Sequence, residues 1–319
     1  MPVNTILLSI AAGLISAIVF VSATTGDMIL RVVLFLLTPF SLYLAGLGFG
    51  PTAAVIAAAT ATLIILGLSN PLTAFVFAAS SALPAVATTY LALLARGEGD
   101  AREWYPVGRI VMVAALFGGG LAAFVMASLG SDLEALTKTL RGVVEVFAKT
   151  EMPAMRGAPE ITPKLIDDMT ASVLQTLPWA LGVLATITIL LNLWLAGRVT
   201  LASGRLPRPW PDISALALPR SAMLALAVAL ALSFAGGVAG LAVRGLAGAF
   251  TFCFAAAGLA LLHSLTRNST WRMFILIAIY SALIAVTVPA TIVLAIAGLI
   301  ETVFHYRALP SEPPENRNL

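Results

Sequence analysis

The stretch LPWALGVLATITILLNLWLAGRV at residues 177–199 decides the class of fold, because no charged residue interrupts it before Arg198. A membrane-spanning α-helix needs about 20 predominantly apolar residues, and this stretch supplies them. Comparable stretches recur along the chain, so the sequence predicts an all-α, polytopic transmembrane helical bundle of about ten spans. We place these spans near residues 5–24, 28–48, 51–69, 71–95, 107–129, 177–199, 221–243, 245–266, 271–287 and 289–306.

Prolines mark several of the breaks between spans, as at Pro51, Pro71 and Pro289. Proline is well suited to the first helical turn, where its missing N–H group costs nothing. Two alternatives remain open: residues 271–306 form one long kinked helix, which gives nine spans, or the short span 51–69 is re-entrant. We expect residues 1–307 to form a single transmembrane domain and residues 308–319 to be a disordered tail.

The composition excludes an ordinary soluble protein. The chain is 60% hydrophobic and 10% charged, with a mean hydropathy of +1.01, whereas soluble domains are about 25% charged. The predicted surroundings are therefore the lipid bilayer. The net charge of +3 is explained by orientation signals in loops, so we expect no nucleic-acid partner. The single cysteine, Cys253, lies inside an apolar stretch and is interpreted as a small buried hydrophobic residue.

The basic residues collect in alternate gaps between the spans. With the N-terminus in the cytoplasm, the inside gaps and the C-terminal tail hold eleven Lys and Arg residues. The short outside gaps hold only Arg31 and Arg244. Cytoplasmic loops carry an excess of Lys and Arg, while long loops are translocated largely regardless of charge. Leaving out the long segment 130–176, the count predicts that both termini are cytoplasmic.

Segment 130–176 is the one sizeable part predicted to lie outside the membrane. Leu133, Leu136, Leu140 and Phe147 recur at helical spacing with charged residues between them, which indicates an amphipathic helix extending the fifth span. Thr162-Pro163 has the form of a helix start that leads into the sixth span. We predict a helical hairpin that projects on the outer side. The alternative is an interfacial helix lying flat on the membrane.

The segment between the sixth and seventh spans is rich in proline and arginine, reading RLPRPWPD at residues 205–212. Proline-rich runs favour extended conformations without helical hydrogen bonds. Trp210 beside arginines suits the headgroup region of a membrane. We interpret this segment as a linker at the membrane surface, with a docking motif as the alternative.

Few polar residues interrupt the spans, and these are the candidates for solute contact. Asn192 lies deep in the sixth span, where its amide can bind a neighbouring helix or a ligand. Glu301 lies in the last span with His305 one turn later, but near the cytoplasmic end, where long side chains reach water. Arg31 and Arg244 near the outer face can bind an anionic solute or anchor to headgroups. The predicted solute-binding set therefore consists of Asn192, Arg31, Arg244 and Glu301.

The first span carries Ser9, Gly13 and Ala17, which are small residues at four-residue intervals. Such a stripe allows two helices to approach closely, so we predict a helix-packing face. The sequence leaves open whether the stripe contacts another part of this chain or a partner protein.

Three stretches together resemble the YybS-like bacterial membrane proteins, a family defined by domain of unknown function 2232. They are 42–50, 191–198 with Leu218-Pro219 downstream, and 297–307. The family often has Asp where this chain has Glu301. The resemblance implies a location in the bacterial inner membrane and a distant likeness to substrate-binding membrane subunits of vitamin transporters. By that analogy the stripe of the first span would contact a membrane coupling partner, although the segment 130–176 departs from that compact form.

The sequence contains no nucleophile elbow, HExxH, Walker motif or paired intramembrane acids. We therefore expect no enzyme activity, no cofactor and no metal. The leading hypothesis is a membrane protein that binds or helps to transport a small solute without an energy source of its own. The alternative is a non-transporting scaffold or assembly factor whose outer hairpin binds an envelope partner.

Overall fold

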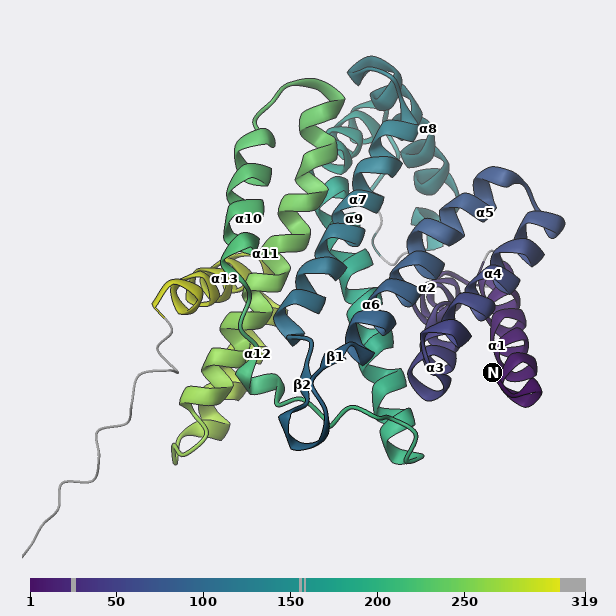
Figure 1. The fold of residues 1–319 in the computed structure, drawn as a ribbon. Coiled ribbons are helices and arrows are strands. Elements are labelled where there is room, and N and C mark those ends of the chain that lie inside the picture. Colours follow the sequence, from purple (N-terminus) through teal and green to yellow (C-terminus); the bar gives the residue numbers. More distant parts are fainter. Residues whose placement is uncertain (24–26, 155–156, 158, 305–319) are drawn as a thin grey trace, which may run out of the picture.

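The computed structural model describes residues 1–23, 27–154, 157 and 159–304, and it confirms an all-α bundle (Figure 1). A two-stranded antiparallel hairpin, β1 (Ala95–Arg96) with β2 (Glu103–Trp104), lies in the loop after the fourth span. The helices are α1 (Val3–Ser22), α2 (Met28–Leu37), α3 (Phe40–Phe49), α4 (Pro51–Leu68), α5 (Pro71–Phe77), α6 (Leu83–Leu93), α7 (Val107–Leu129), α8 (Leu133–Thr150), α9 (Pro163–Ala202), α10 (Arg220–Leu232), α11 (Gly237–Leu265), α12 (Arg272–Ala285) and α13 (Thr287–Phe304).

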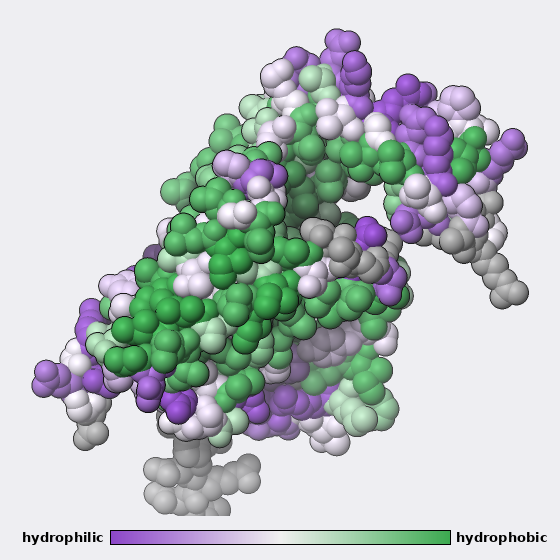
Figure 2. All heavy atoms as spheres, turned by 90° about the vertical axis from the view of Figure 1, so that its right-hand side faces the viewer, coloured by the Kyte–Doolittle hydropathy of each residue, from purple (hydrophilic) through white to green (hydrophobic). Residues whose placement is uncertain are grey.

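Within the described residues, eight helical segments are long and apolar enough to cross a membrane. In this count α2 and α3 together make one segment, as do α5 and α6, which are joined by a π-helical turn at Ala78–Ala82. The other two of the ten predicted spans correspond to shorter apolar helices, α10 and α12, which do not reach the length of a membrane span. The outer surface carries a broad hydrophobic band between hydrophilic regions at the upper right and lower edge (Figure 2). This band is the surface expected to face lipid.

Proline and asparagine start helices where the sequence predicted breaks. Pro51 and Pro71 each occupy the first turn of a helix, and the Asn70 side chain caps α5 by accepting from the Thr73 N–H at 2.9 Å. The described part of the region 271–306, up to residue 304, contains two helices, because the backbone leaves helical geometry at Val286. The alternative of a single long helix in this region is therefore wrong.

The predicted boundary between spans 221–243 and 245–266 is also wrong. Helix α11 runs without interruption from Gly237 past Arg244, and the break instead falls before Gly237, whose φ is +72°. Arg244 stays inside the helix because its side chain reaches the helix end, where it donates to the Gln175 side chain and to the Ser233 carbonyl. Helix α10 consequently has 13 residues, or about 20 Å, which is shorter than the bilayer core.

The segment after α7 forms the predicted helical hairpin, although α8 does not extend α7. The backbone is extended at Gly130, and Asp132 caps a new helix by accepting from the Ala135 N–H at 2.9 Å. The apolar face of α8, including Leu136 and Leu140, packs against α9. Helix α9 has 40 residues, about 60 Å, so its first part projects beyond the bilayer core.

The buried core has two halves. One is centred on α1, α3, α4 and α6, and the other on α7, α10, α11 and α13. Helix α9 contacts α3 on one side and α7 and α11 on the other, so it joins the halves. We call the end that carries β1–β2, the segment 203–219 and the α11–α12 turn the basic end; the N-terminus lies at the same end (Figure 1). The other end is the hairpin end.

Small residues set the closest helix crossings. Helix α13 runs across α11 at a steep angle (Figure 1), and a Cβ atom added at Gly258 would collide with the Leu294 carbonyl. A Cβ atom at Gly298 would collide in the same way with the Phe254 carbonyl. The two backbones therefore touch at this crossing, which is how helices commonly associate in lipid.

We predict that Gly258→Ala destabilises the protein by roughly 1–3 kcal/mol, because neither backbone can move away without losing packing. The matched control is Gly120→Ala in α7, where an added Cβ meets no atom within 4 Å. That control should be neutral or slightly stabilising, since alanine favours helix. Thermal unfolding of both variants in one detergent measures the difference. Equal midpoints would contradict the close α11–α13 crossing.

Candidate functional site

The four candidate solute-binding residues lie on four different helices. Asn192 is on α9, Arg31 on α2, Arg244 on α11 and Glu301 on α13. None of them lines either of the two cavities described below. Their role in solute binding stays a prediction. The residues that line the two cavities are different ones.

The Asn192 side chain binds the backbone where the chain breaks between helices α2 and α3. The break between α2 and α3 at Thr38-Pro39 frees backbone carbonyls inside the membrane, where each needs a donor. The Asn192 Nδ2 atom donates to the Leu36 carbonyl at 2.7 Å, and Ser16 Oγ donates to the Thr38 carbonyl at 2.7 Å. Asn192 is fully buried. Its amide therefore acts as the inter-helix contact that was one of the two predicted roles.

The two arginines and Glu301 have separate surroundings. Arg31 is exposed on α2, and Arg244 points to the hairpin end as described above. Glu301 is only 5% exposed, next to the Gly298 crossing on α11. The expectation that the Glu301 side chain reaches water near the helix end is therefore wrong, because Glu301 lies on the buried side of α13, which packs against α11. His305, its predicted neighbour, lies outside the described residues.

The small-residue stripe of α1 packs inside this chain. Ser9, Gly13 and Ala17 are all buried, and a Cβ atom at Gly13 would collide with the Ala57 carbonyl of α4. Helix α4 thus occupies the face that the transporter analogy would assign to a partner protein. A partner of α1 would have to use its opposite, exposed face, which carries Leu7 and Ile18.

An apolar cavity of 270 Å³ lies near the basic end, where the two halves of the core meet. Helix α9 contributes one wall with Leu193 and Trp194, and α11 contributes Phe252 and Ala256. Such junctions between helices are common places for ligand sites. The remaining lining comes from Leu47, Ala92, Val107, Ile110, Val111, Leu190, Gly197, Leu206, Arg208, Trp210, Pro211, Ile213 and Leu216.

The segment 203–219 covers this cavity, and we call it the strap. The Arg198 guanidinium lies 5.2 Å from the ring centre of Trp210, and that of Arg205 lies 4.9 Å from Phe49. Both distances suit cation–π attraction. At the far end of the strap, a Cβ atom on Gly108 of α7 would collide with the Ala217 carbonyl, so the strap backbone lies directly on α7.

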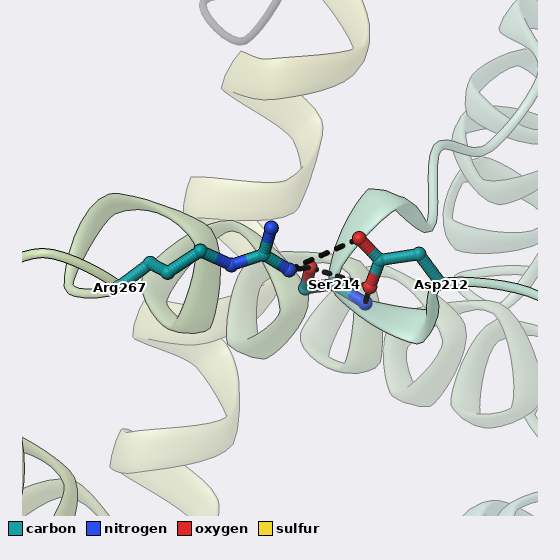
Figure 3. A network of polar contacts seen from close by, with 3 residues as sticks. All are labelled: Asp212, Ser214 and Arg267. Atoms are coloured by element: carbon teal, nitrogen blue, oxygen red, sulfur yellow. Dashed lines mark hydrogen bonds and ion pairs between the residues drawn. The ribbon is translucent and has the colours of Figure 1, made fainter.

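A polar network fixes the middle of the strap to the α11–α12 turn (Figure 3). Arg267 Nη2 donates to Asp212 Oδ2 at 3.0 Å and to Ser214 Oγ at 2.8 Å. Hydrogen bonds from Ser214 and from Arg267 hold the pKa of the Asp212 carboxyl below its usual value. The stabilisation by this carboxylate is therefore present above the ordinary Asp pKa of about 3.9 and is lost as the pH falls through the lowered pKa.

A second cavity of 370 Å³ lies beside the β1–β2 hairpin. Arg96, Glu103, Trp104 and Arg109 line it, so it is more polar than the first. Arg96 Nε donates to Glu103 Oε2 at 2.7 Å, which offsets the charge of both groups. The Arg109 guanidinium lies 5.9 Å from the Tyr105 ring centre. The cavity thus retains positive charge.

Together the two cavities provide burial for an apolar group and positive charge for an anion. Among the described residues no group of three or more His, Cys, Asp or Glu side chains could hold a metal ion. Sequence reasoning missed Trp194 and Arg208 as candidates and assigned Trp210 to a surface linker. The arginine and tryptophan inside RLPRPWPD were the available signal.

We predict that Asp212→Ala loosens the strap and speeds trypsin cleavage after Arg205. Loss of this contact makes local opening of the strap easier, so the cleavage rate should rise about two- to fivefold. Glu103→Ala is the control, because it removes an exposed ion pair at the same end without touching the strap. Mass spectrometry of the fragments gives the rates. Identical cleavage of the two variants would show that the Asp212 network does not fix the strap.

The comparisons with known proteins agree with this architecture. A family model described as "Predicted membrane protein (DUF2232)" matches residues 13–302, which is most of the chain. Neither the curated proteins nor the solved structures contain a match. The matched range includes every membrane helix in whole or in part, the hairpin and the strap. The chain therefore belongs to the DUF2232 family of predicted membrane proteins.

Proposed function

We propose that this protein binds a small, largely apolar solute in the cavity beneath the strap. The observation that supports this proposal is the cavity of 270 Å³, whose wall is almost entirely hydrocarbon and aromatic. The wall is apolar even where the strap, a loop between helices, forms it. A volume near the lower end of the usual 300–1,000 Å³ suits a small molecule or one chain of a larger one. Burial of the apolar part supplies the affinity.

The arrangement supports a role as the solute-binding component of a transport or delivery process. The strap is attached to α7, α9 and the α11–α12 turn, so its displacement would open the cavity at the basic end. A process that moves the solute against a gradient would draw its energy from a separate partner. The scaffold alternative would instead use Val143 and Val146, which are about 60% exposed on α8.

We further propose that the basic end faces the cytoplasm of a bacterial inner membrane. The strap, the β1–β2 loop and the α11–α12 turn bring most of the loop arginines to this end. Positive residues are retained on the cytoplasmic side of short loops. The cavity then opens toward the cytoplasmic leaflet, and the α8–α9 hairpin projects on the outer side.

We predict that Ala256→Phe lowers the affinity for a bound solute at least about tenfold, because the ring fills the cavity. The solute is found by thermal stabilisation of the purified protein across a panel of metabolites and lipids. Ala227→Phe, on an exposed face of α10, adds the same volume away from the cavity and should bind normally. Trp210→Ala, which removes part of the roof, is a second variant.

The experiment has three possible outcomes for the solute-binding proposal. Loss of stabilisation in both cavity variants with normal behaviour of Ala227→Phe supports the proposal. No stabilising compound and no co-purifying small molecule would count against a solute-binding role. Stabilisation that is unchanged in both cavity variants would place the solute elsewhere.

We predict that Gly142→Cys on α8 reacts with a membrane-impermeant maleimide on intact cells. Ala101→Cys, in the loop between β1 and β2, should react only after the membrane is permeabilised. The natural Cys253 is buried and should stay unlabelled in both variants. The opposite pattern of labelling would reverse the proposed orientation.

A further inference from the structure

The apolar and the polar cavity lie close to each other. Arg208 of the strap lines the apolar cavity, and its guanidinium carbon lies 6.0 Å from the ring centre of Trp104. Trp104 lines the polar cavity. The two cavities also meet along the chain at the start of α7, where Val107 belongs to the first and Arg109 to the second. One elongated molecule could therefore occupy both.

The charge on Arg208 is incompletely compensated by the protein. Its Nη1 atom donates to the Ala92 carbonyl at 3.2 Å, and within the described residues no carboxylate forms an ion pair with it. The side chain is about half buried, and this desolvation lowers its pKa without removing its charge at neutral pH. A partly desolvated cation gains from a nearby anion.

We propose that the solute is a single-chain anionic amphiphile with a phosphate-like headgroup. Its hydrocarbon chain lies in the apolar cavity, and its headgroup lies in the polar cavity between Arg208 and Arg109. This inference rests on the proposed solute-binding function and specifies the chemical class of the solute. A phosphate group matches the guanidinium donors of both arginines.

The sizes and charges of the cavities agree with this assignment. The apolar cavity of 270 Å³ lies just below the usual range of ligand pockets, about 300–1,000 Å³, so one hydrocarbon chain suits it better than the two chains of a membrane lipid. Arg96 and Glu103 offset each other, so Arg109 and Arg208 remain as the positive groups beside the headgroup position. The two arginines come from α7 and from the strap, so a bound headgroup would connect these elements.

The test measures binding of dodecyl phosphate to the full chain in a neutral maltoside detergent. Dodecylphosphocholine has the same chain with a zwitterionic headgroup, and inorganic phosphate has no chain. We expect dodecyl phosphate to raise the unfolding temperature more than either of these probes. A brominated-chain analogue should quench tryptophan fluorescence through Trp194 and Trp210, and Trp194→Phe with Trp210→Phe should remove most of that quenching.

Arg208→Gln should weaken dodecyl phosphate binding about tenfold and leave dodecylphosphocholine binding nearly unchanged. Arg208→Lys should recover part of the loss, because it restores the charge without the planar donor geometry. Arg102→Gln is the matched control. Arg102 also lies over the Trp104 ring, at 5.6 Å, but it lines neither cavity, so its replacement should leave binding unchanged.

The outcomes distinguish this inference from the proposed function. If Ala256→Phe abolishes binding of both dodecyl compounds while Arg208→Gln leaves the preference for dodecyl phosphate over dodecylphosphocholine as it is in the unmodified protein, the anionic class is overturned and the solute site stands. If inorganic phosphate stabilises as strongly as dodecyl phosphate, the chain has no part in recognition and the amphiphile is overturned. If dodecyl phosphate binding is indifferent to both Ala256→Phe and Arg208→Gln, both proposals fail.

Discussion

The fold depends on the requirement that every backbone polar group inside the bilayer finds a partner within the protein. An unbroken helix meets this requirement with its own hydrogen bonds. Helices α2 and α3 do not, because Pro39 interrupts the span that they form and leaves carbonyls without helical partners. Asn192 from α9 and Ser16 from α1 supply the missing donors. The Asn192 bond fixes α9 against the first half of the core, and the Ser16 bond fixes α1 to the break between α2 and α3. Because Leu193 and Trp194 follow Asn192 on the same helix, the same contact positions one wall of the apolar cavity.

In the second half of the core, close contact between helix backbones holds the helices together. Apolar side chains gain little from leaving lipid, so association there relies on small residues that let helices touch. The crossing of α11 and α13 at Gly258 and Gly298 and the contact of Gly182 in α9 with Gly245 in α11 are of this kind. Farther along α9 and α11, the larger side chains of Trp194 and Phe252 line the apolar cavity. The strap closes this cavity.

The sequence predicted the membrane helices and the hairpin well, because a run of apolar residues and a proline at a helix start have local causes. The boundary near Arg244 failed for a local reason too: a charge inside an apolar run resembles a loop, but a long side chain can reach the helix end from within. The site was harder to predict. In a membrane protein, the residues that line an apolar cavity are of the same types as those that face lipid, so the sequence does not distinguish them. The polar residues that stood out, such as Asn192, turned out to satisfy the backbone.

The strap shows why charge counts alone could not reveal the site. Its arginines were counted as orientation signals, since positive residues at loop positions report the cytoplasmic side. In the folded chain, Arg205 and the neighbouring Arg198 lie over aromatic rings, and Arg208 lines the apolar cavity and lies over the Trp104 ring. An orientation signal requires only that positive charge stays on one side, whereas these contacts require guanidinium groups at particular positions. Replacing Arg198 and Arg205 by lysine would keep the orientation signal while weakening the roof of the cavity, so the two roles of the same charges are physically separable.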